Sequence, residues 1–216
     1  YFRKLKLIDT NTILTFEQLR LVIVVYTSAI IPLILIPYLT WKNFIPSWVI
    51  VIYIISFITC ALGWEIWFTY GLFEGDNVNL RRASQLSVAI PMHINWLLNS
   101  LADAGTICIG GLLLTWRILN KNNAIFKKWH WSAFFILLTI FIGQNIFVET
   151  FLYHDQLSNG TLISWAPFSP LGSWINPILF NFSDRTVSLQ NQVPWLLMTP
   201  LFYGFLIYYL SKNKNI

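Results

Sequence analysis

The chain has 216 residues, of which 56% are hydrophobic and 11% charged, and its formal net charge is +5. Soluble domains carry about 25% charged residues, so the composition excludes a disordered chain, a coiled coil and an ordinary soluble domain. The basic residues lie at the ends of apolar segments and form no basic stripe, which argues against a nucleic-acid partner. We therefore expect an all-α integral membrane protein.

Five segments are long and apolar enough to cross the hydrocarbon core of a membrane, which takes about 20 helical residues. They cover about residues 19–39, 48–70, 95–116, 131–151 and 193–210. Thr15 and Gln18 are spaced like a capping box before the first of them. Pro32 and Pro37 remove backbone donors inside it and favour a bend. The sequence thus predicts a single polytopic domain over residues 1–216, a bundle of about five transmembrane helices.

An odd number of spans places the connections alternately on two sides. Residues 1–18, 71–94 and 154–192 share one side, called side X, which carries both long loops. The two short loops and the C-terminus share the other, side Y. Side Y carries seven cations and no acid, whereas side X mixes seven cations with six acids. Lysine and arginine in short loops mark the cytosolic side, so we expect side Y to be cytosolic, although the basic cluster near the N-terminus favours the reverse.

Three acidic residues lie inside predicted spans: Glu65 in the second, Asp103 in the third and Glu149 in the fourth. A carboxylate at the bilayer centre costs about 2.5–3.5 kcal/mol on insertion scales, so acids in such positions are candidates for function. All three lie toward the side X ends of their spans. We expect them to be catalytic carboxyls at a similar depth in the membrane.

Amide side chains recur on the same helices. Asn95, Asn99 and Asp103 follow one another at intervals of four residues, and Asn145 precedes Glu149 by the same interval, so each set shares one helix face. Such faces should point into the bundle, because amides in lipid lack partners. The pattern predicts a polar cavity that opens toward side X. The alternative is that the asparagines only hold helices together.

Aromatic and small residues complete the expected cavity. Trp64, Trp67 and Trp96 are predicted to line its apolar wall, with Asn95, Asn99 and Asn145 orienting substrate or water. Three glycines of the third span would allow close packing around it: Gly105, Gly110 and Gly111.

The two long loops each allow two interpretations. Arg81 and Arg82 have the forked donors that match phosphate or carboxylate groups, so they are predicted to bind a lipid headgroup or pyrophosphate. They could instead form a salt-bridged turn with Glu74 and Asp76. The aromatic loop 154–192 is either a lid over the bundle or an anchor to the interface or to a partner subunit.

No cofactor is expected. His93 and His154 could join a carboxylate in a metal site, but solvated loop histidines are the commoner outcome. Phosphate-binding loops and the nucleophile-elbow motif are absent from the sequence. Cys60 and Cys108 both lie in apolar stretches and are predicted to be free, buried thiols.

The pair Trp64–Glu65, late in the second span, resembles the Trp-Glu of fungal meroterpenoid cyclases. Those are small helical membrane enzymes thought to protonate an epoxide through acidic residues. The resemblance covers two residues of 216, and that family is usually given seven spans where this chain has five. It implies acid chemistry on an isoprenoid-like substrate.

Three functions are compatible with these features. The first is a membrane enzyme of the isomerase, cyclase or hydratase type, which acts on a lipid-like or isoprenoid substrate. A buried carboxyl tends to be neutral and can protonate an alkene, epoxide or carbonyl, with Asp103 or Glu65 as donor and Glu149 as counterpart. The alternative is a non-catalytic membrane subunit or assembly factor. The third is a proton- or cation-coupled carrier, disfavoured because the acids lie at one end of the bundle.

Overall fold

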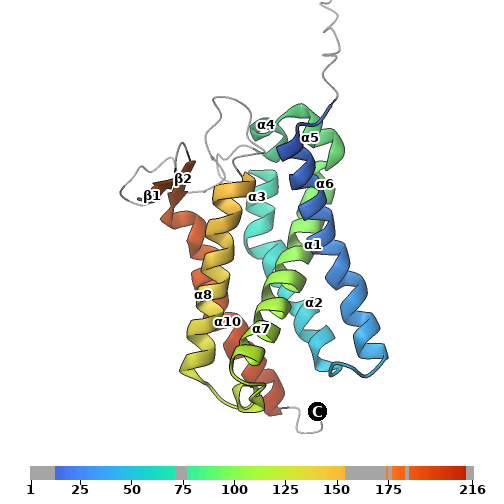
Figure 1. Ribbon diagram of the computed structural model, residues 1–216, viewed down its shortest axis with the longest axis vertical. Coiled ribbons are helices and arrows are strands. Elements are labelled where there is room, and N and C mark those ends of the chain that lie inside the picture. The colour runs from blue at the N-terminus through green and yellow to red at the C-terminus, as the bar shows by residue number, and fades with distance from the viewer. Residues whose placement is uncertain (1–12, 72–76, 154–173, 175–176, 183–184, 213–216) are drawn as a thin grey trace, which may run out of the picture.

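The computed structural model describes residues 13–71, 77–153, 174, 177–182 and 185–212. Within them, five helices are long and apolar enough to cross a membrane. These helices cover Phe16–Trp41, Trp48–Tyr70, Met92–Ile118, Trp131–Leu152 and Leu189–Lys212. They pack side by side as an all-α membrane bundle (Figure 1), as the sequence predicts.

Two of the spans are continuous α-helices. The first, α1 (Phe16–Trp41), starts where Thr15 and Gln18 form the predicted capping box, and it continues through both of its prolines. The fifth, α10 (Leu189–Lys212), begins four residues before the predicted apolar segment. This earlier start adds three consecutive amide residues to the helix, and they matter for the site.

The other three spans contain π-helical segments. The second span consists of α2 (Trp48–Cys60), η1 (Ala61–Glu65) and α3 (Ile66–Tyr70). The third consists of α6 (Met92–Ala102), η2 (Asp103–Ile109) and α7 (Gly110–Ile118). The fourth consists of α8 (Trp131–Val148) and η4 (Glu149–Tyr153).

Each intramembrane acid lies at one end of a π-helical segment. Glu65 ends η1, Asp103 begins η2 and Glu149 begins η4. Widened turns of this kind are rare and occur frequently at functional sites. The three acids therefore mark places where the regular helix is interrupted in three separate spans.

The connections lie at two ends of the bundle, as the alternation of sides predicts (Figure 1). Side X holds the short helices α4 (Val78–Arg81) and α5 (Ser84–Ala89), together with the strands β1 (Ile178–Phe182) and β2 (Arg185–Ser188). The two strands form an antiparallel hairpin in which Phe180 faces Val187 and Asn181 faces Thr186. The sequence analysis did not predict this hairpin. Side Y holds residues 42–47, the 3₁₀ turn η3 (Asn123–Phe126) and the end of α10.

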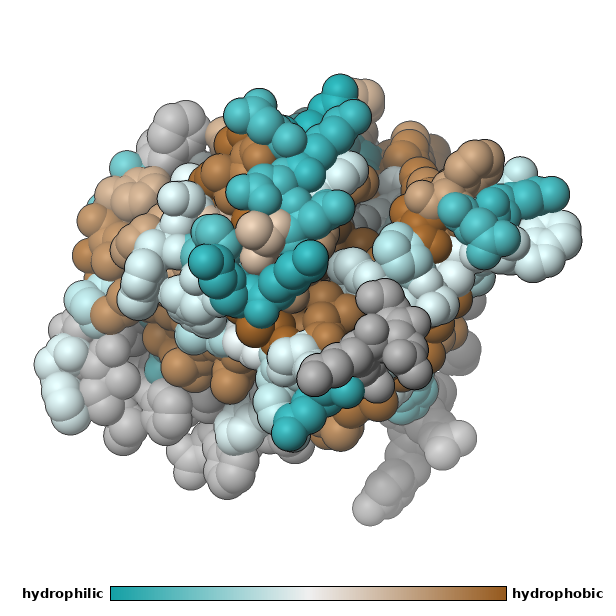
Figure 2. Space-filling view, turned by 90° about the horizontal axis from the view of Figure 1, so that it is seen from below, coloured by the Kyte–Doolittle hydropathy of each residue, from teal (hydrophilic) through white to brown (hydrophobic). Residues whose placement is uncertain are grey.

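Hydrophilic side chains gather on the side Y end (Figure 2). Among the described residues its cations are Lys42, Arg117, Lys121, Lys127, Lys128 and Lys212. No acidic residue of the sequence falls in these connections. Side Y is thus a uniformly cationic end of an otherwise apolar bundle.

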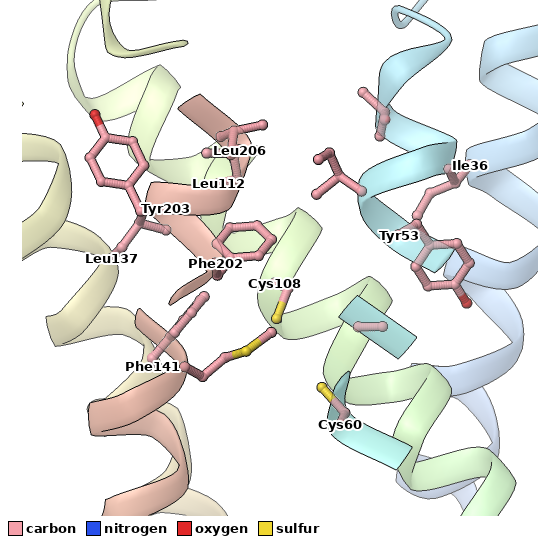
Figure 3. Packing of buried hydrophobic residues seen from close by; sticks show 14 of the residues in the cluster. Ile36, Tyr53, Cys60, Cys108, Leu112, Leu137, Phe141, Phe202, Tyr203 and Leu206 are labelled. Carbon is pink, nitrogen blue, oxygen red and sulfur yellow. The ribbon is translucent and has the colours of Figure 1, made fainter. Parts of the chain in front are cut away.

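An apolar cluster fills the bundle interior below the polar residues of side X. It includes Phe141 of α8, Leu112 of α7 and Phe202 of α10, all buried (Figure 3). Cys60 and Cys108, from neighbouring spans, belong to the same cluster and are free thiols, as predicted. Close packing of such side chains stabilises the association of membrane helices through van der Waals contacts.

Glycine allows the third span to approach its neighbours closely. A Cβ placed on Gly105 would lie 2.4 Å from Cβ of Pro32 in α1, and one on Gly111 would lie 3.0 Å from the Phe141 ring. The close packing predicted at these two glycines is therefore present. A Cβ on Gly110 would meet nothing nearer than 3.8 Å, so the prediction is wrong there.

Candidate functional site

A cavity of about 260 Å³ lies among all five spans in the half of the bundle toward side X. Each span contributes to its wall. Five of the residues singled out from the sequence line it: Trp64, Glu65, Asn99, Asp103 and Asn145.

The carboxyls of Glu65 and Asp103 both lie in the wall of this cavity. Glu65 is buried, with 2% of its surface exposed. Trp64 Nε1 donates a hydrogen bond to Asp103 Oδ2 at 2.8 Å, and Asn99 lines the same cavity. Oε2 of Glu65 has no hydrogen-bond partner among the described residues. The second and third spans thus present two carboxyls to one cavity, and the Asp103 carboxyl is fixed by the Trp64 indole.

Arg81 lies behind the acid pair and does not line the cavity. Its buried guanidinium donates to the carbonyl oxygen of Phe68, near the end of the second span, and its charge acts on Glu65. It thereby supplies a positive charge close to the carboxyls. The alternative pairing with Glu74 and Asp76 lies outside the described residues.

Arg82 connects the 77–90 segment to the helices. Its donors bind Oδ1 of Asn95 at 3.0 Å, Oγ of Ser87 at 3.2 Å, Oδ1 of Asn79 at 3.3 Å and the carbonyl oxygen of Ile90. Burial, together with the charge of Arg81, lowers the pKa of Arg82 from 12.5 to about 10, so it remains charged at neutral pH. A guanidinium occupied by four protein acceptors is placed to hold the fold rather than to receive a headgroup.

Asn95 does not line the cavity, contrary to expectation. It accepts the Arg82 hydrogen bond and donates to Oγ1 of Thr69 at 3.4 Å, so it ties α6 to α3. It shares a helix face with Asn99 and Asp103, but it lies about one turn nearer side X than Asn99 and two turns nearer than Asp103, and it contacts the loop instead.

Trp67 and Trp96 do not line the cavity either. Trp96 Nε1 donates to the carbonyl oxygen of Ala61 at 2.9 Å, in the π-helical segment of the second span. Trp67 lies three residues after Trp64 in a span whose helical repeat is interrupted, and it falls outside the lining. The second aromatic wall is Trp195 of α10, whose ring centroid lies 5.3 Å from that of Trp64.

Glu149 belongs to a separate polar network beside the cavity. Its buried carboxyl accepts hydrogen bonds from the backbone N–H of Ser188 at 3.1 Å, from Nε2 of Gln192 at 2.7 Å and from Nδ2 of Asn191. Nδ2 of Asn145 donates to the Asn191 carbonyl oxygen and to Oε1 of Gln192, both at 2.8 Å. Glu149 therefore fixes the start of α10 and reaches the cavity only through Asn145 and Asn191.

Asn191 and Gln192 were not among the expected site residues. The apolar segment starts at Val193, so the hydropathy pattern places both of them in a loop. The available signal was the run Gln190-Asn191-Gln192 directly before that segment, since amides beside a membrane helix need partners inside the bundle.

The cavity reaches residues on the surface that the membrane would cover. Val24 of α1 and Phe147 of α8 both line it, and they are 36% and 56% exposed. The expected opening toward side X stays a prediction.

Within the part of the chain that the structure describes, no three His, Cys, Asp or Glu side chains come together in a way that could hold a metal ion. His93 Nδ1 is hydrogen bonded to the Tyr70 hydroxyl at 2.8 Å. His154 and residues 154–173 of the predicted lid or anchor lie outside the described residues.

Two carboxyls, an indole donor and an amide in a largely apolar cavity can move protons to and from a bound molecule. The Asp103 carboxyl is held by the Trp64 N–H, so it is positioned before any ligand arrives. No protein-family model, no curated protein and no solved structure matches this chain.

Proposed function

We propose that the chain is an integral membrane enzyme that performs acid–base chemistry on a lipid-like substrate, with Glu65 and Asp103 as the proton-transferring pair. The observation that carries the proposal is the meeting of these two carboxyls in a cavity inside the bundle. Charged groups in membrane spans are costly and mark functional sites by default. Two of them in one cavity, each at the edge of a π-helical segment, are hard to explain by packing alone.

The geometry suggests how the pair would divide its work. One carboxyl, protonated, donates to an alkene, epoxide or carbonyl of the substrate, and the other accepts a proton from a neighbouring atom. This gives an isomerase, cyclase or hydratase reaction without a cofactor. Proton transfer by a positioned side chain contributes about 10²–10⁴-fold to a rate. The rings of Trp64 and Trp195 line the same cavity and would stabilise a developing cation through their faces.

A substrate of lipid-like or isoprenoid character fits the cavity's surroundings. An opening between the exposed lining residues Val24 and Phe147 would admit molecules from the bilayer, and the lining away from the acids is apolar. About 260 Å³ is at the small end for ligand pockets. The cavity would hold the reacting end of such a molecule while the rest remained in the opening or in lipid.

Glu149 takes a positioning role in this proposal, in place of the counterpart role expected from sequence. Its carboxyl accepts hydrogen bonds from Asn191, which lines the cavity, and from Ser188 and Gln192 on either side of the start of α10. The orientation follows the distribution of charge: the cationic side Y faces the cytosol, and the acid pair lies toward the opposite leaflet.

The test compares lipid extracts from membranes that contain the full chain or its variants, by untargeted mass spectrometry. Asp103→Asn and Glu65→Gln remove one carboxyl each with little change in shape. Glu17→Gln makes the same chemical change at an exposed acid outside the cavity. The proposal expects a product that is made by the wild type and by Glu17→Gln but by neither cavity variant. Identical profiles from all four proteins would contradict it.

A non-catalytic subunit or assembly factor is the second candidate. Leu80 and Val88, between the second and third spans, are 66% and 82% exposed, and these apolar side chains would suit contact with a partner subunit. Purification of the chain alone in mild detergent separates the two candidates. A stable, monodisperse protein favours the enzyme, and instability relieved by a co-purifying membrane protein favours the subunit.

A proton- or cation-coupled carrier receives less support. Such a carrier needs a polar route across the bundle. Below the acid pair, the apolar cluster around Phe141 and Phe202 packs in the interior toward side Y (Figure 3).

A further inference from the structure

A second, larger cavity lies in the side Y half of the bundle. Its volume is about 670 Å³, and its wall comes from the second half of α1, the start of α2, η2 with α7, and η3. The lining is almost entirely apolar. We call this cavity the side Y chamber. It is separate from the acid pair, and Thr106, whose hydroxyl donates to the Ser28 carbonyl oxygen at 2.6 Å, lines both cavities.

The dimensions of the chamber match one leaflet. It follows α1 from Ile31 to Leu39, which is roughly 12 Å at 1.5 Å per residue. Half of the hydrocarbon core of a bilayer is about 15 Å thick. The chamber therefore extends from the side Y interface nearly to the midplane, the depth that one acyl chain occupies. Its lining residues Leu35 and Leu113 are exposed, so the chamber is open to lipid.

Two lysines lie near the interfacial end of the chamber. Nζ of Lys42 is 4.4 Å from the ring centroid of Trp41, and Nζ of Lys121 is 6.0 Å from that of Trp116. Trp116 lines the chamber and donates from Nε1 to Oδ1 of Asn123, another lining residue, at 2.8 Å. Lys42 comes just before the lining residues Phe44 to Pro46. Cationic side chains are thus attached to both walls of the apolar chamber.

We propose that the side Y chamber binds one acyl chain of an anionic phospholipid of that leaflet, with Lys42 and Lys121 pairing with the phosphate. An apolar chamber alone would accept any lipid. Discrimination comes from the charge, since side Y has no acid in its connections and basic residues at an interface attract anionic headgroups. The site is independent of the acid–base chemistry proposed above.

The experiment measures lipid bound to the purified full chain by native mass spectrometry. The probes are phosphatidylglycerol and phosphatidylcholine with the same acyl chains, so that only the headgroup differs. We expect the wild type to retain one phosphatidylglycerol with about tenfold preference or more, from two lysines near the surface. Equal retention of both lipids by the wild type would overturn the proposal.

Two variants separate the headgroup from the chain. Lys42→Gln combined with Lys121→Gln should retain the two lipids equally. Its control, Lys212→Gln combined with Lys214→Gln, removes the same charge from the last residue of α10, which does not line the chamber, and from a residue two positions later in the sequence; it should behave as wild type. If the first pair keeps the preference, or the control loses it to the same degree, the proposal is wrong.

Gly110→Leu tests the chamber itself. A Cβ on Gly110 would meet no atom within 3.8 Å, and the residue lines the chamber, so leucine fills the space without a backbone clash. We expect it to lose both lipids, whereas Gly143→Leu, at an open site elsewhere, should keep them. Retention by Gly110→Leu at the wild-type level would overturn the proposal, as would a dimer of the chain that takes the place of lipid. If Gly110→Leu does not fold, the variant with Lys42→Gln and Lys121→Gln tests the proposal on its own.

Discussion

Trp64 Nε1 donates a hydrogen bond to Asp103 Oδ2 at 2.8 Å, and this contact joins the second span to the third at the wall of the cavity. Glu65, the next residue, turns its carboxyl to the same cavity. Two consecutive residues therefore have different functions at the cavity: Trp64 positions the Asp103 carboxyl, and Glu65 supplies the second carboxyl.

Trp64→Phe keeps an aromatic side chain but removes the indole and its N–H donor. A hydrogen bond to a charged group contributes about 1.5–3 kcal/mol. Without it the Asp103 carboxyl is less well fixed, and we expect turnover to fall about tenfold to a hundredfold while the fold is retained. The rate of formation of the lipid product measures this effect. Trp131→Phe, an exposed tryptophan at the side Y end, is the control and should leave the rate unchanged.

Glu149→Gln should affect stability more than chemistry. The amide offers one acceptor oxygen where the carboxyl offers two, so one of the donors of Ser188, Asn191 and Gln192 loses its partner. A buried unsatisfied group costs about 1–3 kcal/mol. We expect a lower thermal midpoint in detergent and near-normal activity per folded molecule. Loss of activity at an unchanged thermal midpoint would instead show that Glu149 takes part in the reaction.

Gly105→Ala should destabilise the bundle. The new Cβ would overlap the Pro32 ring, which cannot move aside as a flexible chain end would. Overpacking of this kind costs about 1–3 kcal/mol. Gly143→Ala, with nothing within 4 Å of its Cβ, is the matched control. Thermal unfolding of both variants checks the prediction, and equal midpoints would refute the close contact between α1 and η2.

Tyr203→Phe tests the side Y end of the bundle. The buried Tyr203 hydroxyl donates to the Ile125 carbonyl oxygen at 2.9 Å and accepts from the His130 N–H at 3.3 Å, so it joins α10 to η3 and to the start of α8. Removal of the hydroxyl leaves both groups unpaired, and we expect a loss of about 1–3 kcal/mol. Tyr208→Phe, at an exposed position of the same helix, should cost much less. Comparable losses in the two variants would show that the buried hydroxyl contributes nothing.

The bundle could be predicted from sequence because hydropathy over about 20 residues dominates the placement of membrane helices. The link between Glu65, Asp103 and Asn99 was also within reach, since the last two are four residues apart on one helix face. Which acids share a cavity depends on helix rotation, and the π-helical segments alter that rotation locally. Nothing in the sequence pattern placed Glu149 outside the shared cavity.

Contacts between segments that are distant in the sequence account for the remaining differences between the predicted and the observed site. Arg82 binds Asn95, which removes both from the expected ligand site, and no local pattern links a loop arginine to that helix face. Asn191 was hidden because the helix begins before its apolar segment does. The strands around Phe180 and Val187 are only five and four residues long, too short for a clear alternating signal.

The most direct test of the acid pair is the rate of lipid conversion in Asp103→Asn, in Glu65→Gln and in the double variant, each shown to be folded. Groups that act as one unit give strongly non-additive losses. We expect each single variant to lose about 10²-fold or more and the double variant to lose no more than the worse single one. The account is contradicted if the rate loss of the double variant equals the product of the two single losses, because Glu65 and Asp103 would then act independently. Full activity in either single variant would also contradict a shared catalytic function.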